Sequence, residues 1–223
     1  MCHLYQQAPE LKKVSVHIIC TDELTGIQAL ERQYPTLPMR PLQVERQEFF
    51  YFRHGTQCLI ANFSVAEGRI VAPSILDTRK EADFSAHIQQ TIDTDPEACW
   101  LFIVDQLNTH KSEALVRLVA SHCSIDCDLG IKGKEGILKS QKTRAAFLSD
   151  KSHRIRLVYT PKHASWLNQI EIWFSILVRR LLKRASFSSK ENLRQRLIKF
   201  IEYFNTTMAK PFNWTYTGYP LKA

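Results

Sequence analysis

Two short apolar runs limit most strongly how this chain can fold. Residues 16–21 and 100–104 consist largely of apolar and β-branched side chains, which is the composition of buried strands. Each run is followed directly by an aspartate, Asp22 after the first and Asp105 after the second. Because neighbouring strands bring their ends together at one edge of a sheet, we expect the two carboxylates to lie close together.

Strand and helix patterns follow one another along the rest of the chain. Residues 58–73 are predicted to form a hairpin around Glu67-Gly68, whereas residues 22–55, with three prolines, are expected to be irregular. Apolar spacing predicts helices over 80–94, 168–184 and 189–207, a helix opening after Ser112, and a short strand over 155–159. This order indicates an α/β domain with a mixed sheet flanked by helices.

The predicted domain covers residues 14–210. Residues 1–13 and 211–223 are expected to be an N-terminal and a C-terminal tail. Residues 123–154 have no clean period and many basic side chains, so we interpret them as an insertion that precedes the helix at 168 and is partly helical from about 138 to 148.

Charge is divided unevenly along the chain. Residues 1–130 carry 11 Lys+Arg and 17 Asp+Glu, whereas residues 131–223 carry 19 and 5, a balance of +14 within a total of +8. A block this basic attracts polyanions, above all nucleic acid. The candidate phosphate-binding residues are Lys132, Lys134, Lys139, Lys142, Arg144, Arg179, Arg180, Lys183 and Arg184. A solvated charged face, or cations that favour a helix C-terminus at 179–184, is the alternative interpretation.

A third acid, Glu171, lies early in the helix that is expected to begin at Asn168. If Asn168 caps this helix, Glu171 shares an apolar face with Phe174 and Val178. A carboxylate on such a face needs a partner, and a metal ion is a suitable one. Taken singly, the aspartates could be turn residues and Glu171 could complete a cap. Together, the three acids predict a site for hard divalent cations such as magnesium.

Two motifs around these acids resemble a known family. Asp105-Gln-Leu-Asn-Thr-His110 and Thr160-Pro-Lys-His-Ala-Ser-Trp-Leu-Asn-Gln-Ile-Glu171 are similar to the second and third catalytic motifs of mariner-like bacterial insertion-sequence transposases. These enzymes belong to the DDE superfamily of endonucleases. The third motif is the specific one, since a dozen residues match in order, whereas the first, at Thr21-Asp22-Glu23, is short.

The resemblance implies a ribonuclease H-like fold and a metal-dependent DNA endonuclease and strand-transferase. It implies that the catalytic residues, which hold two Mg²⁺ ions that Mn²⁺ can replace, are Asp22, Asp105 and Glu171. Three further residues are expected to support them: Asn168, His110 and His163. The implied partner is double-stranded DNA, as transposon ends and as target, and the chain is expected to form a homodimer.

The chain departs from the family pattern at three points. Gln106 follows the second aspartate where the family commonly has asparagine. Asp105 and Glu171 are 66 positions apart, more than is usual for the family. The chain also begins almost at the first catalytic strand, without the helix-turn-helix region of such transposases. We therefore expect an isolated catalytic domain, a truncated copy or one half of a split gene.

Two other functions stay open. One is a truncated, non-catalytic DNA-binding or assembly module derived from a transposase. The other, ranked far behind, is a glycoside hydrolase with paired carboxylates, which would not need the basic second part of the chain.

Trp166 and Trp173, on either side of Glu171, are expected to be core residues.

The sequence also predicts where the protein works. Its six cysteines are scattered, only Cys123 and Cys127 lie close together, and this spacing does not favour a zinc site. No export signal or membrane-spanning stretch is found. We expect a reduced, cytoplasmic bacterial protein that joins the nucleoid when it is bound to DNA.

Overall fold

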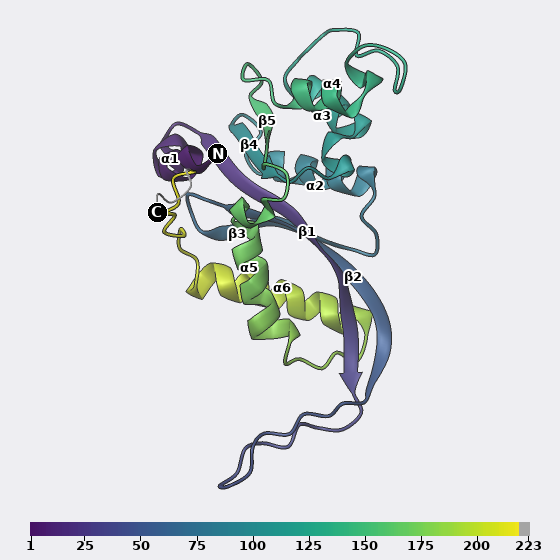
Figure 1. The fold of residues 1–223 in the computed structure, drawn as a ribbon, viewed down its shortest axis with the longest axis vertical. Helices are drawn as coiled ribbons and strands as arrows, with labels where there is room; N and C mark the ends of the chain where they lie inside the picture. Colours follow the sequence, from purple (N-terminus) through teal and green to yellow (C-terminus); the bar gives the residue numbers. More distant parts are fainter. Residues whose placement is uncertain (219–223) are drawn as a thin grey trace.

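A five-stranded mixed sheet lies between two layers of helices (Figure 1). The computed structural model describes residues 1–218. The strand order is β3-β2-β1-β4-β5, with central β1 antiparallel to β2 and parallel to β4. The strands are β1 (Val16–Arg32), β2 (Tyr51–Ser64), β3 (Arg69–Leu76), β4 (Cys99–Val104) and β5 (Ile155–Tyr159). The predicted α/β architecture with a mixed sheet is confirmed.

Each face of the sheet has its own core. Helices α1 (Cys2–Lys13), α5 (Ile170–Leu177) and α6 (Lys190–Thr207) cover one face, which we call the α5 face. Helices α2 (Glu81–Ile92), α3 (Glu113–His122) and α4 (Gln141–Leu148) cover the other, the α2 face. Alternate residues of the strands enter the two cores, as the period of a strand requires. Among them, Ile18 and Cys20 face α5, and Ile19 faces α2.

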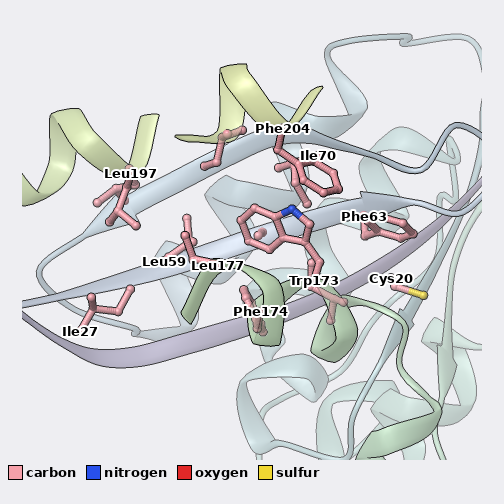
Figure 2. Packing of buried hydrophobic residues seen from close by; sticks show 14 of the residues in the cluster. Cys20, Ile27, Leu59, Phe63, Ile70, Trp173, Phe174, Leu177, Leu197 and Phe204 are labelled. Atoms are coloured by element: carbon pink, nitrogen blue, oxygen red, sulfur yellow. The ribbon is translucent and has the colours of Figure 1, made fainter. Parts of the chain in front are cut away.

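The core of the α5 face is built around a tryptophan. Figure 2 shows the Trp173 ring between the sheet and α6, near Phe63 of β2 and Phe204 of α6. Trp173 is fully buried, and its ring centroid is 6.0 Å from that of Phe204. Burying a large apolar side chain of this kind contributes about 1.5–3 kcal/mol. This packing fixes α5 against the sheet.

The helices begin where the sequence provides caps. The Ser112 hydroxyl accepts a hydrogen bond of 3.3 Å from the amide of Leu115, so the predicted cap of α3 is confirmed. Ser189 accepts one of 3.0 Å from the amide of Asn192 at the start of α6. Each bond satisfies an amide that would otherwise have no partner within the helix.

Residues 22–55 were predicted to be irregular, but they are strand at both ends, so this prediction is wrong for residues 22–32 and 51–55. β1 continues to Arg32 and β2 begins at Tyr51, and together they form a long two-stranded arm that projects from the sheet (Figure 1). Buried Ile27 and Ala29 alternate with exposed neighbours, which is the strand pattern in this stretch. The three prolines fall in residues 33–50, which connect the two strands. Proline has no amide hydrogen to donate to a strand ladder, and this connection does not need one.

Residues 1–13, predicted to be a tail, contain helix α1, so this prediction is also wrong. Cys2, Tyr5 and Ala8 recur every three residues and are buried. The Tyr5 hydroxyl donates a hydrogen bond of 2.7 Å to the carbonyl of Leu167. This contact ties α1 to the segment that leads into α5.

The predicted C-terminal tail and insertion also contribute to the cores. The ring of Phe212 stacks on Phe63 with centroids 4.6 Å apart, while residues 219–223 of the tail lie outside the described residues. Leu138 and Leu148, in the predicted insertion 123–154, are fully buried on the α2 face. The helical part of this segment, α4, falls within the predicted range 138–148. Among residues 1–218, no helix combines the length and apolar character needed to cross a bilayer.

Candidate active site

Asp22 and Asp105 lie at the same level of two neighbouring parallel strands. β1 and β4 pair in register as far as Cys20 and Ile103, so each aspartate is two residues beyond the last pair. Because side chains alternate between faces, both aspartates are placed on the α5 face with Cys20 and Ile103. Asp22 lies inside β1 rather than at its end, because only the pairing with β4 stops there.

Asp22 is largely buried, with 8% of its surface exposed. Its Oδ1 accepts a hydrogen bond of 2.8 Å from the amide of Glu23. Burial, and after it the negative charges of Asp105 and Glu23, raise the pKa of Asp22 to about 7. Carboxylates held this close repel one another, and a bound cation relieves the repulsion.

Asp105 is held on one of its two oxygens. Its Oδ1 accepts hydrogen bonds of 2.8 Å from the amide of Leu107 and of 2.8 Å from Nδ1 of His110. Burial alone raises the pKa of the Asp105 carboxyl, but these two bonds outweigh it and keep the pKa below its usual value. Asp105 is therefore ionised over the whole physiological pH range.

Glu171 lies in the first turn of α5 and is exposed. The prediction that it lies on the inward apolar face is wrong, because the buried face of α5 consists of Ile170, Trp173, Phe174 and Leu177. Partial burial, followed by the charge of Asp105, raises the pKa of the Glu171 carboxyl above its usual value. Glu171 is thus within electrostatic range of Asp105.

Asn168 is buried and connects α5 to the central strand. Its Nδ2 donates a hydrogen bond of 3.1 Å to the carbonyl of Thr21, next to Asp22. The prediction that Asn168 caps the helix with its side chain is wrong, because the amide is directed to β1 and Gln169 stands at the cap position without a side-chain bond. Asn168 therefore links the segment before Glu171 to the residue before Asp22.

The donor atoms fit a divalent cation, although the acids do not form a compact cage. Within residues 1–218, no three His, Cys, Asp or Glu side chains lie close enough together to hold one metal ion. Among these described residues, no hydrogen bond reaches the Oδ2 atoms of Asp22 and Asp105, so both oxygens are available to a hard cation. Glu171, being exposed, has the rotamer freedom to turn toward them. The roles of the three acids as catalytic residues and metal ligands stay predictions.

His110, predicted as a supporting residue, is fully buried beside Asp105, and it brings in a residue that the sequence prediction missed. Its Nε2 lies 3.3 Å from Oε2 of Glu23, whose side chain is only 2% exposed. Burial lowers the pKa of His110, but its two carboxylate neighbours outweigh burial and raise the pKa to about 9. Glu23 could have been found from its place directly after Asp22, because alternation along a strand puts it on the opposite face of β1.

A comparison with known families decides the classification. The sequence profile described as DDE superfamily endonuclease matches residues 17–194, which include Asp22, Asp105 and Glu171. The chain belongs to the DDE superfamily of endonucleases. The superfamily membership implied by the catalytic motifs is thereby confirmed. No curated protein matches this DDE chain.

Solved structures support the fold of this DDE domain. A Mos1 mariner paired end complex with Mn has a TM-score of 0.54 at 12% identity, over 90% of this chain and 52% of that one. The isolated catalytic domain of Mos1 mariner transposase gives 0.52 at 10% identity, over 90% of this chain and 77% of that one. The predicted ribonuclease H-like fold is therefore confirmed, and the chain spans about half the length of the Mos1 chain in the complex.

A cleft opens beside Asp105 on the DDE domain. It has a volume of about 400 Å³ and is lined by Asp105, Gln106, Thr160, Pro161, Lys162, His163 and Ser165. His163, a predicted supporting residue, therefore borders the same cleft as Asp105.

The two tryptophans near Glu171 differ in exposure. Trp166 is 56% exposed, so the prediction that it is a core residue is wrong. Trp173 is fully buried, so the same prediction for Trp173 is confirmed. An edge contact with Tyr216, with centroids 5.2 Å apart, supports the Trp166 ring from one side.

The candidate DNA-binding residues of the DDE domain separate into two groups. Lys132, Lys134, Lys139 and Lys142 are exposed on the α2 face, and Arg179, Arg180, Lys183 and Arg184 are exposed at the end of α5. Arg144 is different, because it is 8% exposed and its guanidinium donates to the carbonyls of Lys111 and Leu138. Its burial and these two backbone contacts argue against the predicted DNA-binding role of Arg144.

Proposed function

We propose that this chain is the catalytic domain of a DNA transposase that cleaves and joins phosphodiesters, with Asp22, Asp105 and Glu171 as its catalytic acids. One observation carries the proposal. Asp22 in β1 and Asp105, directly after the parallel strand β4, occupy equivalent positions in a DDE superfamily chain, and Asn168, just before the helix of Glu171, bonds to the carbonyl of Thr21 beside Asp22. Structures of Mos1 with Mn and with Mg support a requirement for divalent metal.

The three acids would hold two Mg²⁺ ions, for which Mn²⁺ can substitute. When bound, such ions activate the attacking oxygen and stabilise the leaving oxygen of a phosphodiester. Asp105 presents an ionised carboxylate, because His110 and the Leu107 amide lower its pKa. Asp22 provides a second carboxylate on the neighbouring strand, and Glu171 adds a third from α5.

The exposed basic residues serve to bind double-stranded DNA, as transposon ends and as target. Phosphate contacts from lysine and arginine give affinity that is independent of sequence and falls steeply with salt. The first group lies on and before α4, and the second follows α5. These two helices cover opposite faces of the sheet, so we assign the two groups to separate stretches of duplex. One of the similar solved structures is a Mos1 mariner paired end complex, which is consistent with this use.

A homodimer is part of the same proposal. The projecting arm exposes large apolar side chains, among them Phe49 at 87% and Phe50 at 70%. An apolar surface of this kind on a projecting hairpin is suited to burial against a second copy. Replacing Phe49 and Phe50 with serine is expected to shift the mass measured by light scattering from dimer to monomer.

Nicking of supercoiled plasmid in the presence of Mn²⁺ tests the catalytic assignment. Asp105→Ala should abolish nicking and leave salt-sensitive duplex binding intact, because the basic residues are unchanged. Asp95→Ala is the matched control, since it removes a carboxylate paired with a buried histidine, His17, at the opposite end of the sheet. It should nick like the wild type.

The outcomes separate the candidate functions. If Asp105→Ala retains nicking, the assignment of the three acids is incorrect. If the wild type binds duplex DNA but never nicks it, the chain is instead a non-catalytic DNA-binding or assembly module.

A further inference from the structure

A buried histidine joins two carboxylates that come from different strands. His110 is not exposed to solvent, and its two ring nitrogens face opposite partners. Nδ1 lies 2.8 Å from Oδ1 of Asp105, and Nε2 lies 3.3 Å from Oε2 of Glu23, a charge contact that does not meet the geometry of a hydrogen bond. The chain Glu23–His110–Asp105 therefore runs from the α2 side of β1 to the end of β4.

The His110 ring is held in place by its surroundings. The Phe84 ring of α2 packs against it with centroids 4.3 Å apart. The hydroxyl of Tyr159 donates a hydrogen bond of 2.8 Å to the His110 carbonyl. These contacts fix the position of the ring but touch neither nitrogen, so the partners of Nδ1 and Nε2 decide its rotation and, through Nδ1, the orientation of Asp105.

Glu23 is an unusual residue for this position. Its side chain is 2% exposed, and no hydrogen bond reaches Oε1 from the described residues. Burying a carboxylate with an unsatisfied oxygen is costly. Replacing a buried ion pair with apolar side chains of similar size often leaves a protein equally stable or makes it more stable. Stability alone therefore does not account for Glu23.

We propose that Glu23 and His110 are positioning residues for the candidate metal site. Glu23 orients His110, and His110 fixes Oδ1 of Asp105, so that Oδ2 of Asp105 stays turned toward a cation shared with Asp22. The inference rests on the proposed function, because it assigns these two residues a role in the same site. Partners that orient a ligand in this way commonly change metal affinity by about 10–100-fold.

Direct measurement of Mn²⁺ binding tests this role without an activity assay. The paramagnetic resonance signal of free Mn²⁺ is followed as the full chain is titrated, for the wild type, Glu23→Ala, Glu23→Gln and Asp95→Ala. We expect Glu23→Ala to bind Mn²⁺ at least about 10-fold more weakly. Glu23→Gln, which keeps an acceptor oxygen for His110, should recover most of the affinity, and Asp95→Ala should match the wild type.

Nicking kinetics provide a second readout. For Glu23→Ala, the Mg²⁺ concentration that gives half-maximal rate should rise by the same factor, while the rate at saturating Mg²⁺ recovers most of its wild-type value. Should Glu23→Ala not fold, Glu23→Asp replaces it, because a carboxylate one methylene shorter keeps the charge but cannot reach Nε2. It should also weaken Mn²⁺ binding.

Two results would contradict the proposal in distinguishable ways. If a folded Glu23→Ala or Glu23→Asp binds Mn²⁺ as tightly as the wild type, the positioning role is wrong and the proposed function is unaffected. If the wild type itself binds no Mn²⁺, both the positioning role and the proposed function are wrong.

Discussion

The side-chain amide of Asn168 donates a hydrogen bond of 3.1 Å to the carbonyl of Thr21, across 147 positions of sequence. Through this bond, the start of the helix that carries Glu171 is attached to the residue before Asp22. The relative position of the two acids thus depends on a buried polar contact as well as on apolar packing.

Asn168→Ala is expected to lower both stability and nicking. Loss of the buried bond leaves the Thr21 carbonyl without its partner, which costs about 1–3 kcal/mol in the free energy of unfolding. Asn205→Ala is the control, because Asn205 makes 2.8 Å hydrogen bonds to both the amide and the carbonyl of Ile70 on the same face of the sheet, away from the acids. Urea unfolding should show a loss for both variants, and nicking per folded molecule should fall only for Asn168→Ala. Equal nicking by the two variants would show that the Thr21 contact is irrelevant to the site.

Arg144 and Lys142 should respond differently to substitution, although both lie on α4. Arg144→Ala leaves the carbonyls of Lys111 and Leu138 without donors, so unfolding should become easier by about 1–3 kcal/mol. Lys142→Ala should change stability by less than about 0.5 kcal/mol. It should instead lower the slope of log affinity for duplex DNA against log salt by about 1. An unchanged salt slope for Lys142→Ala would remove that lysine from the DNA-binding surface.

The two tryptophans near Glu171 form a second contrasting pair. Trp173 is fully buried in the α5-face core, so Trp173→Ala should lower the free energy of unfolding by about 3–5 kcal/mol. Trp166 is 56% exposed beside the cleft, and Trp166→Ala should lower it by no more than about 0.5 kcal/mol. Urea denaturation at pH 7 measures both. A loss of several kcal/mol for Trp166→Ala would mean that its ring is part of the core in solution.

One contribution to stability, that of a buried histidine of α2, should be lost as the pH drops below about 6.5. His87 of α2 is 1% exposed, its Nδ1 lies 2.8 Å from the Ser74 hydroxyl, and burial lowers its pKa to about 3. In the unfolded chain the His87 ring is protonated near pH 6.5, whereas in the folded chain it stays neutral. Lowering the pH therefore favours unfolding through this residue. Between pH 7 and pH 5 the contribution of His87 is about 2 kcal/mol. His87→Gln cannot titrate, so urea unfolding should show that, on going from pH 7 to pH 5, this variant gains about 2 kcal/mol of stability relative to the wild type.

Much of the fold could be predicted from local patterns. The spacing of Phe84, Ile88 and Ile92 predicted α2, and each of these residues is fully buried. Asp22 and Asp105 were identified because each follows an apolar run, and the parallel register of β1 and β4 makes them neighbours. The long arm was missed. β1 continues beyond Asp22 because it pairs there with β2, a long-range contact that local patterns do not reveal. The three prolines of residues 33–50 made the whole of residues 22–55 look irregular.

The sequence by itself determined the strands of the sheet without its arm, most helices, the family and the three candidate acids, because periodicity and motif order are properties of neighbouring residues. Only the tertiary structure decided that Glu23 is buried against His110, that Arg144 binds backbone carbonyls, and that Glu171 lies on the exposed side of α5. These outcomes depend on how segments far apart in sequence pack and which polar groups they leave to be satisfied. A buried donor or acceptor takes the partner that the fold places beside it.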